Sequence, residues 1–259
     1  MGCLFDCCKK QKGKKKIVNK SANIETELDL IKDNEVKNIK YNNTNNISLI
    51  TESKIGFYNE GGSCYMASII QVLIHLKSLI GIFLKKKIKK NPLSKIFNDL
   101  LVKIINSEES IEIKDFSKGY NKINSKFTGD KGNNPMTFFS EFIQQLDSEN
   151  PGILDLFSGK NLIQFQGSIE ENYEEDFIFY MVCLDSNHIN INQAIHIQKE
   201  MEDDPSIKLI FTIILKPKIF VINLEVEDIE YYFENIIQID DAIYELKAIN
   251  EYNDFHSKV

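Results

Sequence analysis

One cysteine in this sequence is placed to act as a nucleophile. Cys64 follows Gly61 and Gly62 and opens a stretch whose apolar residues recur at helical spacing. Attack on a carbonyl by cysteine requires the thiolate, which the N-terminus of a helix stabilises through unpaired N–H groups and the helix dipole. The glycines let a substrate chain approach closely, and the side-chain amide of Asn59 can stabilise an oxyanion. On these features alone, a buried structural cysteine at a helix start is the favoured interpretation.

Cysteine catalysis also needs a base that takes up the thiol proton and returns it to the leaving amine, and imidazole suits both steps. The sequence offers four histidines. His75 lies three turns along the same predicted helix as Cys64, too far away to reach its sulfur. His188 and His196 lie in a polar connection and beside an apolar run. His256 follows the last predicted strand.

The elements that would position these residues change in type along the chain. Helices are predicted over Ser63–Lys85, Ser94–Asn106 and Pro135–Leu146, the last opening with a proline. After residue 160 the pattern becomes β-rich, with predicted strands over Leu162–Gly167, Phe177–Leu184, Leu209–Leu215, Ile219–Leu224, Ile236–Ile239 and Ala242–Tyr252. Helices followed by strands indicate an α+β fold. The acidic segment Glu170–Asp176 is predicted to be a solvated loop.

Two segments precede the predicted folded domain of residues 51–259. Residues 1–20 form a Cys/Lys-rich tail with seven lysines and one acid, a balance of +6 in a chain of net charge −7, so the remainder carries −13. Residues 21–50 are polar and predicted to be a disordered tether. A basic tail on an acidic body suits an anionic membrane surface or a basic partner, and indicates no nucleic-acid binding.

The cysteine pattern bears on the compartment. Three of the five cysteines fall within the first eight residues and no secretory signal precedes them, which favours a reducing, cytoplasmic compartment over a disulfide framework. No apolar run approaches the ~20 residues that span a bilayer.

The segment around Cys64 resembles the cysteine box of ubiquitin-specific proteases. That pattern is Gly-Leu-x-Asn-x-Gly-Asn-Thr-Cys-Tyr-Met-Asn-Ser followed by Leu-Gln, and this chain reads Gly-Phe-Tyr-Asn-Glu-Gly-Gly-Ser-Cys-Tyr-Met-Ala-Ser over residues 56–68, then Ile70-Gln71. The positions that match in register are Gly56, Asn59, Gly61, Cys64, Tyr65, Met66, Ser68 and Gln71. The resemblance implies that Cys64 is the nucleophile and Asn59 the oxyanion donor. The departures at Gly62, Ser63 and Ala67 remove no reacting group.

Further segments resemble the family in the same order, over about residues 54–259. They are Asn134–Phe139, Phe165–Gly167, Lys216–Leu224 and Tyr244–Ile249. The resemblance implies a papain-like fold, with a helical thumb-like half followed by a β-rich palm and fingers half. It also implies that His256 is the base, although the Gly and Tyr that flank the family's histidine are missing; a surface histidine in a terminal tail is the alternative.

Two other family features are absent from the sequence. The family places an Asp or Asn that orients the imidazole about fifteen residues after the histidine, and this chain stops at Val259, which predicts either a truncated product or an impaired enzyme. Nothing in the sequence places Asp240 or Asp241 where either could orient the imidazole. Paired Cys-x-x-Cys zinc ligands are also missing, so we expect no metal, no cofactor, and a core position for Cys183.

The first residues look like a lipid anchor. Met1-Gly2-Cys3 with Cys7-Cys8 and a lysine cluster resembles a myristoylated and palmitoylated N-terminus, with Gly2, Cys3, Cys7 and Cys8 as acceptors. Asp6 departs from the acceptor motif, which has Ser or Thr there. A plain disordered basic tail is the alternative.

The leading functional hypothesis is a thiol hydrolase that cleaves after the C-terminal Gly of ubiquitin, with ubiquitin and ubiquitinated proteins as partners. The runner-up is a catalytically impaired member that binds ubiquitin or scaffolds a membrane complex. A small-molecule acyl hydrolase is a third hypothesis, and it has only the Cys64 helix in its favour.

Overall fold

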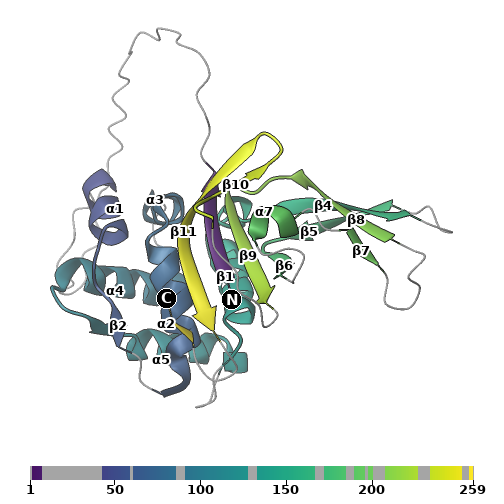
Figure 1. Cartoon of the computed structure of the whole chain (residues 1–259). Coiled ribbons are helices and arrows are strands. Elements are labelled where there is room, and N and C mark those ends of the chain that lie inside the picture. The colour runs from purple at the N-terminus through teal and green to yellow at the C-terminus, as the bar shows by residue number, and fades with distance from the viewer. Residues whose placement is uncertain are drawn as a thin grey trace, which may run out of the picture.

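The computed structural model describes residues 2–7, 43–58, 61–85, 91–127, 133–166, 172–184, 190–195, 198–200, 208–226, 234–252 and 257–258. The helices gather on one side of the molecule and the strands on the other, which confirms the α+β prediction (Figure 1). A two-stranded parallel ladder of β2 (Phe57–Tyr58) and β3 (Ile111–Glu112) lies within the helical half.

The helical half is built around buried aromatic rings. Its α-helices are α1 (Asn43–Thr51), α2 (Cys64–Ile74), α3 (Lys77–Lys85), α4 (Pro92–Asn106), α5 (Lys114–Ile123) and α6 (Pro135–Glu149). Short 3₁₀ turns are η1 (Gly61–Ser63), η2 (Ser125–Phe127) and η3 (Leu154–Leu156). Phe138 on α6 lies within 6 Å, ring centre to ring centre, of Tyr65, Tyr120, Phe127 and Phe142. These rings pack helices from distant segments into one core.

The predicted single helix over Ser63–Lys85 is wrong in one respect, because it is two helices. Helices α2 and α3 meet at an angle of 84° across His75 and Leu76. The His75 ring is fixed at the bend by its Nδ1, 2.9 Å from the carbonyl oxygen of Thr51, and by its Nε2, 3.1 Å from Gln71. Apolar periodicity continues through the bend, so the sequence pattern does not reveal it. The helices predicted at 94–106 and 135–146 are confirmed, with bounds that differ by two or three residues.

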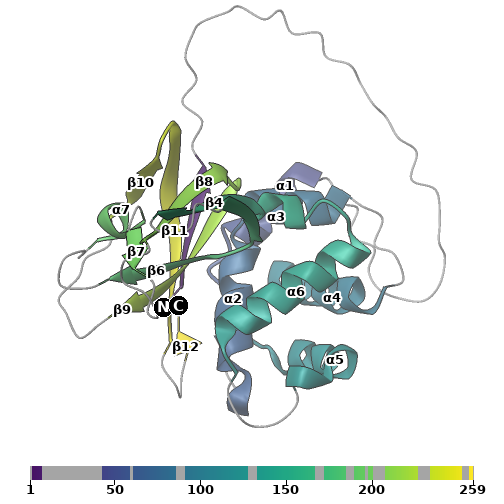
Figure 2. The same cartoon turned by 90° about the vertical axis from the view of Figure 1, so that its right-hand side faces the viewer.

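The main sheet faces helix α2 (Figure 2). Its strand order is β10-β11-β1-β9-β6, with β12 paired to β11. The bounds are β1 (Gly2–Cys7), β6 (Tyr180–Leu184), β9 (Ile219–Val226), β10 (Ile236–Ile239), β11 (Ala242–Tyr252) and β12 (Ser257–Lys258). Side chains of β9 alternate between two cores: Ile219 and Val221 join the helical core, while Phe220 and Ile222 join a second core on the far face.

Two segments before residue 51 form secondary structure, so the folded part of the chain is not confined to residues 51–259 as predicted. Gly2–Cys7 forms β1, which pairs antiparallel with both β9 and β11, and Asn43–Thr51 forms α1. A six-residue strand whose partners lie more than 200 positions away leaves no local periodic signal, so the sequence pattern indicates only a tail there. Acylation of Gly2, Cys3 and Cys7, whose backbone lies in β1, and of Cys8, outside the described residues, stays a prediction.

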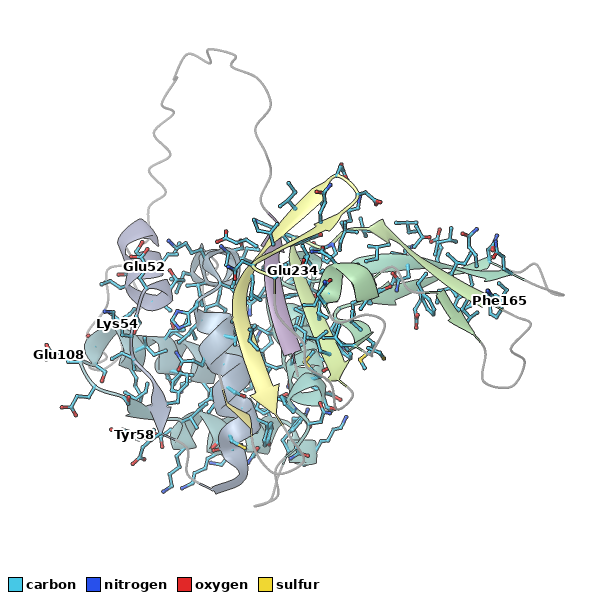
Figure 3. All side chains as sticks on the ribbon, in the orientation of Figure 1. Glu52, Lys54, Tyr58, Glu108, Phe165 and Glu234 are labelled. Carbon is cyan, nitrogen blue, oxygen red and sulfur yellow. The ribbon has the colours of Figure 1, made fainter. Side chains whose placement is uncertain are left out.

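A second, four-stranded sheet extends away from the helices. Its order is β5-β4-β8-β7, with β4 (Gly159–Gln166), β5 (Asn172–Phe177), β7 (Gln198–Glu200) and β8 (Lys208–Leu215), and Phe165 lies toward its outer end (Figure 3). The Phe177 ring covers Gly159, where a Cβ atom would come within 2.3 Å of it. The acidic segment predicted as a loop is a strand from Asn172 onward, although its acidic side chains are exposed. The predicted strand Phe177–Leu184 is divided between β5 and β6, and a short helix, α7 (Ile191–Ala194), packs on β6.

In the part of the chain that the structure describes, no single helix is long and apolar enough to cross a membrane. Among the described helices, the bent pair of α2 and α3 has the necessary length and composition when the two are taken together.

Candidate active site

Cys64 is the first residue of helix α2, as the sequence predicts. The 3₁₀ turn η1 directly precedes Cys64, and no carboxylate lies in the first turn of the helix. The thiol residue is buried, with 7% of its surface exposed. A group at this position faces the unpaired N–H groups of a helix start, which favour negative charge on the thiol or on an oxyanion formed beside it.

The segment that precedes Cys64 is held in place by the short parallel ladder of β2 and β3. Phe57 and Tyr58 of β2 pair with Ile111 and Glu112 of β3, and the amide of Ile111 donates to the carbonyl oxygen of Gly56 at 3.0 Å. Tyr58 lies at the outer edge of the helical half with its side chain exposed (Figure 3). Asn59, the predicted oxyanion donor, comes next and lies outside the described residues.

Tyr65 locks the start of α2 to the rest of the helical half. Its ring stacks on Phe127 and meets Phe138 edge to face. Its hydroxyl donates to the carbonyl oxygen of Phe127 and accepts from Nδ2 of Asn133, each at 3.4 Å. Burial raises the pKa of Tyr65; the hydrogen bond from Asn133 opposes that rise, and the neighbouring Cys64 adds to it. The neutral hydroxyl therefore persists as a donor around neutral pH.

A surface groove lies next to the start of helix α6. This helix begins at Pro135 and is capped by Asn134, whose side-chain oxygen accepts from the amides of Met136 and Thr137 at 2.8 and 3.1 Å. The groove, of about 400 Å³, lies between α6 and the strands β6 and β9. It is lined by Lys126, Asn134, Met136, Thr137, Ser140, Glu141, Phe179, Met181 and Asn223. Because Asn133 bonds to Tyr65, the groove starts close to the residue that follows the thiol.

The C-terminal strands of the main sheet contact α2 directly. Strands β11 and β12 both contact this helix, and β12 pairs with the end of β11 through Glu251–Lys258 and Tyr252–Ser257. His256, the predicted base, directly precedes β12 but lies outside the described residues. The strands that flank it are thus placed against the helix that Cys64 begins (Figure 2).

The described candidates other than Cys64, which are His75, Asp240 and Asp241, lie away from it. His75 lies at the far end of α2 in a structural role, bonded to Thr51 and Gln71, as predicted. His188 and His196 lie outside the described residues. Asp240 and Asp241 occupy the β10–β11 turn and form ion pairs with Lys216 at 3.0 and 2.6 Å. Those hydrogen bonds and charges raise the pKa of Lys216 and lower that of Asp241.

Comparison with known proteins decides the family. The family model described as ubiquitin carboxyl-terminal hydrolase matches residues 55–244, which is most of the chain. The chain belongs to the ubiquitin carboxyl-terminal hydrolase family. No curated protein matches it. Membership of this hydrolase family implies a papain-like cysteine peptidase fold, and the matched range contains Cys64 and ends before His256.

A larger pocket, of about 520 Å³, adjoins the groove, and Phe179 and Met181 line both. It is formed by β5, β6 and neighbouring segments and lined by aromatic residues, among them Phe177, Phe179 and Phe211. Cys183, predicted as a core residue, is half-buried and lines this pocket. Across the described residues, no three His, Cys, Asp or Glu side chains gather as a metal site requires.

Sequence reasoning missed most of the groove. Phe179, Met181 and Asn223 reach it from strands that the pattern predicts, but their side of the sheet becomes clear only when the sheet is placed against α6. The Asn133–Tyr65 hydrogen bond was also missed. The only available signal was the pair of polar residues before Pro135, which indicates a helix cap rather than a contact with the nucleophile's neighbour.

Proposed function

We propose that this protein is a deubiquitinating thiol hydrolase that cleaves the bond after the C-terminal Gly of ubiquitin in ubiquitin–protein conjugates. The observation that carries the proposal is the placement of Cys64: it is buried at the first residue of α2, inside the segment that matches the hydrolase family. The thiolate attacks the carbonyl carbon of the ubiquitin glycine, and the lysine amine of the conjugate leaves.

In this mechanism each step is assigned to residues of the chain. The N–H groups at the start of α2 and the Asn59 amide stabilise the tetrahedral oxyanion. His256 takes the thiol proton, gives it to the leaving amine, and then activates the water that hydrolyses the acyl thioester. The residue that orients the imidazole is not assigned.

The groove and the charge of the body suit the tail of ubiquitin. An extended chain that ends in glycines can lie along the groove, where Met136, Phe179 and Met181 offer apolar contact and Asn134 and Asn223 offer polar groups. The chain after residue 20 carries a net charge of −13, which complements a basic tail.

The test is incubation with ubiquitin that carries a C-terminal electrophile. We expect a covalent adduct on Cys64 that disappears in Cys64→Ala and persists in Cys183→Ala, the matched cysteine control. Release of a fluorophore from the ubiquitin C-terminus should fall by about 10³-fold or more in Cys64→Ala and His256→Ala. The same rate should change less than about threefold in His75→Ala, His188→Ala and His196→Ala. Binding without an adduct would overturn hydrolysis and leave the impaired ubiquitin-binding member at a membrane as the function.

Attachment to the cytoplasmic face of a membrane is a separate proposal, supported by Gly2, the cysteines at 3, 7 and 8, and the seven lysines of residues 1–20. Two acyl chains, or one chain with the lysine patch, are needed for stable anchoring. In cells, Gly2→Ala should move the protein from the membrane fraction to the soluble fraction. Unchanged partition would refute acylation of Gly2.

A further inference from the structure

The centre of the main sheet is filled by the first residues of the chain. Strand β1 pairs with β9 from Gly2↔Asn223 to Asp6↔Ile219, and with β11 from Gly2↔Asn250 to Cys7↔Tyr244. Figure 1 shows β1 between these two strands. Backbones two strands apart in a sheet are separated by about 9.6 Å, so β9 and β11 do not pair directly where β1 lies between them.

The partners of β11 change along its length. Ala242–Glu245 pair with β10 on the outer side, and Glu251–Tyr252 pair with β12. Between them, Ala248–Asn250 pair with β1 and with no other strand in the part of the chain that is described. The register shifts at Lys247, which stands opposite no residue of β1. Such bulges redirect the side chains that follow, and Ala248 indeed joins the helical core, whereas Leu246 packs on the other face.

Near the β10–β11 turn, side-chain contacts join β11 to the segment just before β9 without involving β1. The Tyr244 hydroxyl donates to the carbonyl oxygen of Pro217 at 2.8 Å, and Lys216 binds the two acids of the β10–β11 turn. These ties lie beside Cys7, the last residue of β1. The opposite end of β1, from Gly2 to Leu4, pairs with the part of β11 that leads to β12 and helix α2.

We propose that β1 is a positioning strand: its Gly2–Leu4 end holds Ala248–Asn250 of β11, and through them β12, against helix α2. The catalytic consequence rests on the function proposed above. In that function β1 sets the position of β11 and β12, the strands that flank His256 in the sequence, relative to the helix that Cys64 begins.

The test places the same substitution at opposite ends of β1. Proline removes a backbone N–H and is not accommodated in a central strand. In Cys3→Pro, hydrogen exchange of the amides at 248–250 should accelerate by at least about tenfold, while amides in α2, α4 and α6 keep their rates. In Cys7→Pro the side-chain ties at the turn end persist, so the same amides should change by less than about threefold. Cys3→Ser and Cys7→Ser control for loss of the thiols.

A second readout reports on the thiol itself. A thiol paired with imidazole reacts with iodoacetamide at pH 6.5, whereas an isolated thiol is only about 1% ionised there. The rate of Cys64 alkylation at pH 6.5 relative to pH 9, followed on its peptide by mass spectrometry, should fall about tenfold in Cys3→Pro and stay unchanged in Cys7→Pro. Turnover should also be impaired in Cys3→Pro and not in Cys7→Pro. In Cys3→Pro the kcat should fall while the KM stays within about threefold, because the groove is intact.

The outcomes separate the two proposals. Faster exchange throughout both halves in Cys3→Pro would make β1 a general stability element and overturn the positioning role, as would unchanged exchange at 248–250. A full-length protein whose Cys64 is unreactive at pH 6.5 would count against the proposed base. The exchange comparison between Cys3→Pro and Cys7→Pro would still decide the inference about β1.

Discussion

The helical half and the main sheet differ in how far apart in the sequence their packed segments lie. Helices α1 to α6 follow one another between residues 43 and 149 and share one core. The main sheet instead joins β1, from residues 2–7, to strands that begin after residue 215. Cys64 therefore stands on the half whose segments follow one another in the sequence, and the strands that face its helix belong to the half that long-range pairing builds.

This difference predicts unequal responses to perturbation. A long-range pairing must overcome the entropy of closing its loop before it contributes to stability, whereas neighbouring helices close short loops. Changes within the aromatic core should therefore affect the whole helical half, including the position of Cys64. Changes in the sheet should act on the strands opposite it.

The largest effect is expected from Phe138→Ala. Phe138 is fully buried and contacts four other aromatic rings, so its loss removes apolar contact area and leaves a cavity between α2 and α6. The free energy of unfolding, measured by urea denaturation, should fall by about 3–5 kcal/mol. Tyr173→Ala on β5, where the ring is about half exposed, is the control and should cost under about 1 kcal/mol. A loss below that value at Phe138 would contradict the idea of a single aromatic core.

The next largest effect is a loss of stability at alkaline pH, caused by ionisation of Tyr180 in the main sheet. Burial raises the pKa of Tyr180 on β6 to about 12. A raised pKa means that the folded state holds the proton more tightly, so this contribution to stability is complete below pH 10 and is lost as the pH rises through 12. The loss is about 2–3 kcal/mol when both states are ionised. Urea denaturation at pH 9.5 and 11.5 should show a smaller drop for Tyr180→Phe than for the unchanged protein. Equal drops would show that Tyr180 does not titrate in this way.

The sequence predicts the position of Cys64 and the helical segments that follow residues 63, 93 and 134, because these have local signals, but it does not predict α1 and α5. The glycines and the apolar spacing around Cys64 and the proline at residue 135 mark elements that the structure contains. Most of the strands after residue 160 are also predicted, since β-branched and aromatic runs indicate them without knowledge of their partners, whereas β5, β7 and β12 are not.

What the sequence does not predict depends on contacts between distant residues. Strand β1 has no local signature, and the bend between α2 and α3 is held by Thr51, which precedes α2 by more than ten residues. The groove requires the sheet to be placed against α6. The place of Cys64 at a helix start was therefore predictable, whereas its surroundings were not.

Glu149→Gln tests whether the helical half also relies on a distant contact. The carboxylate of Glu149, at the end of α6, accepts hydrogen bonds from the amides of Leu93 and Ser94 and from the Ser94 hydroxyl, at 3.1, 2.6 and 2.6 Å. It caps the start of α4, where negative charge is favoured. The substitution should cost about 1–2 kcal/mol in urea denaturation. The matched control is Glu141→Gln on the same helix, whose ion pair with Lys126 is exposed and should contribute under about 0.5 kcal/mol. Equal effects would show that Glu149 does not act as a cap.

The smallest effect is expected from Tyr65→Phe, compared with Tyr120→Phe in the same core. The Tyr65 hydroxyl joins the start of α2 to Phe127 and Asn133 through two long hydrogen bonds, so its removal should cost about 1 kcal/mol. The Tyr120 hydroxyl is buried, and apart from the Asn124 side chain, which opposes the rise in its pKa caused by burial, it has no polar partner among the residues that the structure describes, so Tyr120→Phe should cost less than Tyr65→Phe. Because both changes remove one oxygen and keep the ring, the difference between them isolates the bonds of Tyr65. If those bonds also hold the thiol in place, Tyr65→Phe alone should slow the reaction of Cys64 with the ubiquitin electrophile. Equal rates in the two variants would assign the position of Cys64 to the packing of the rings and not to these hydrogen bonds.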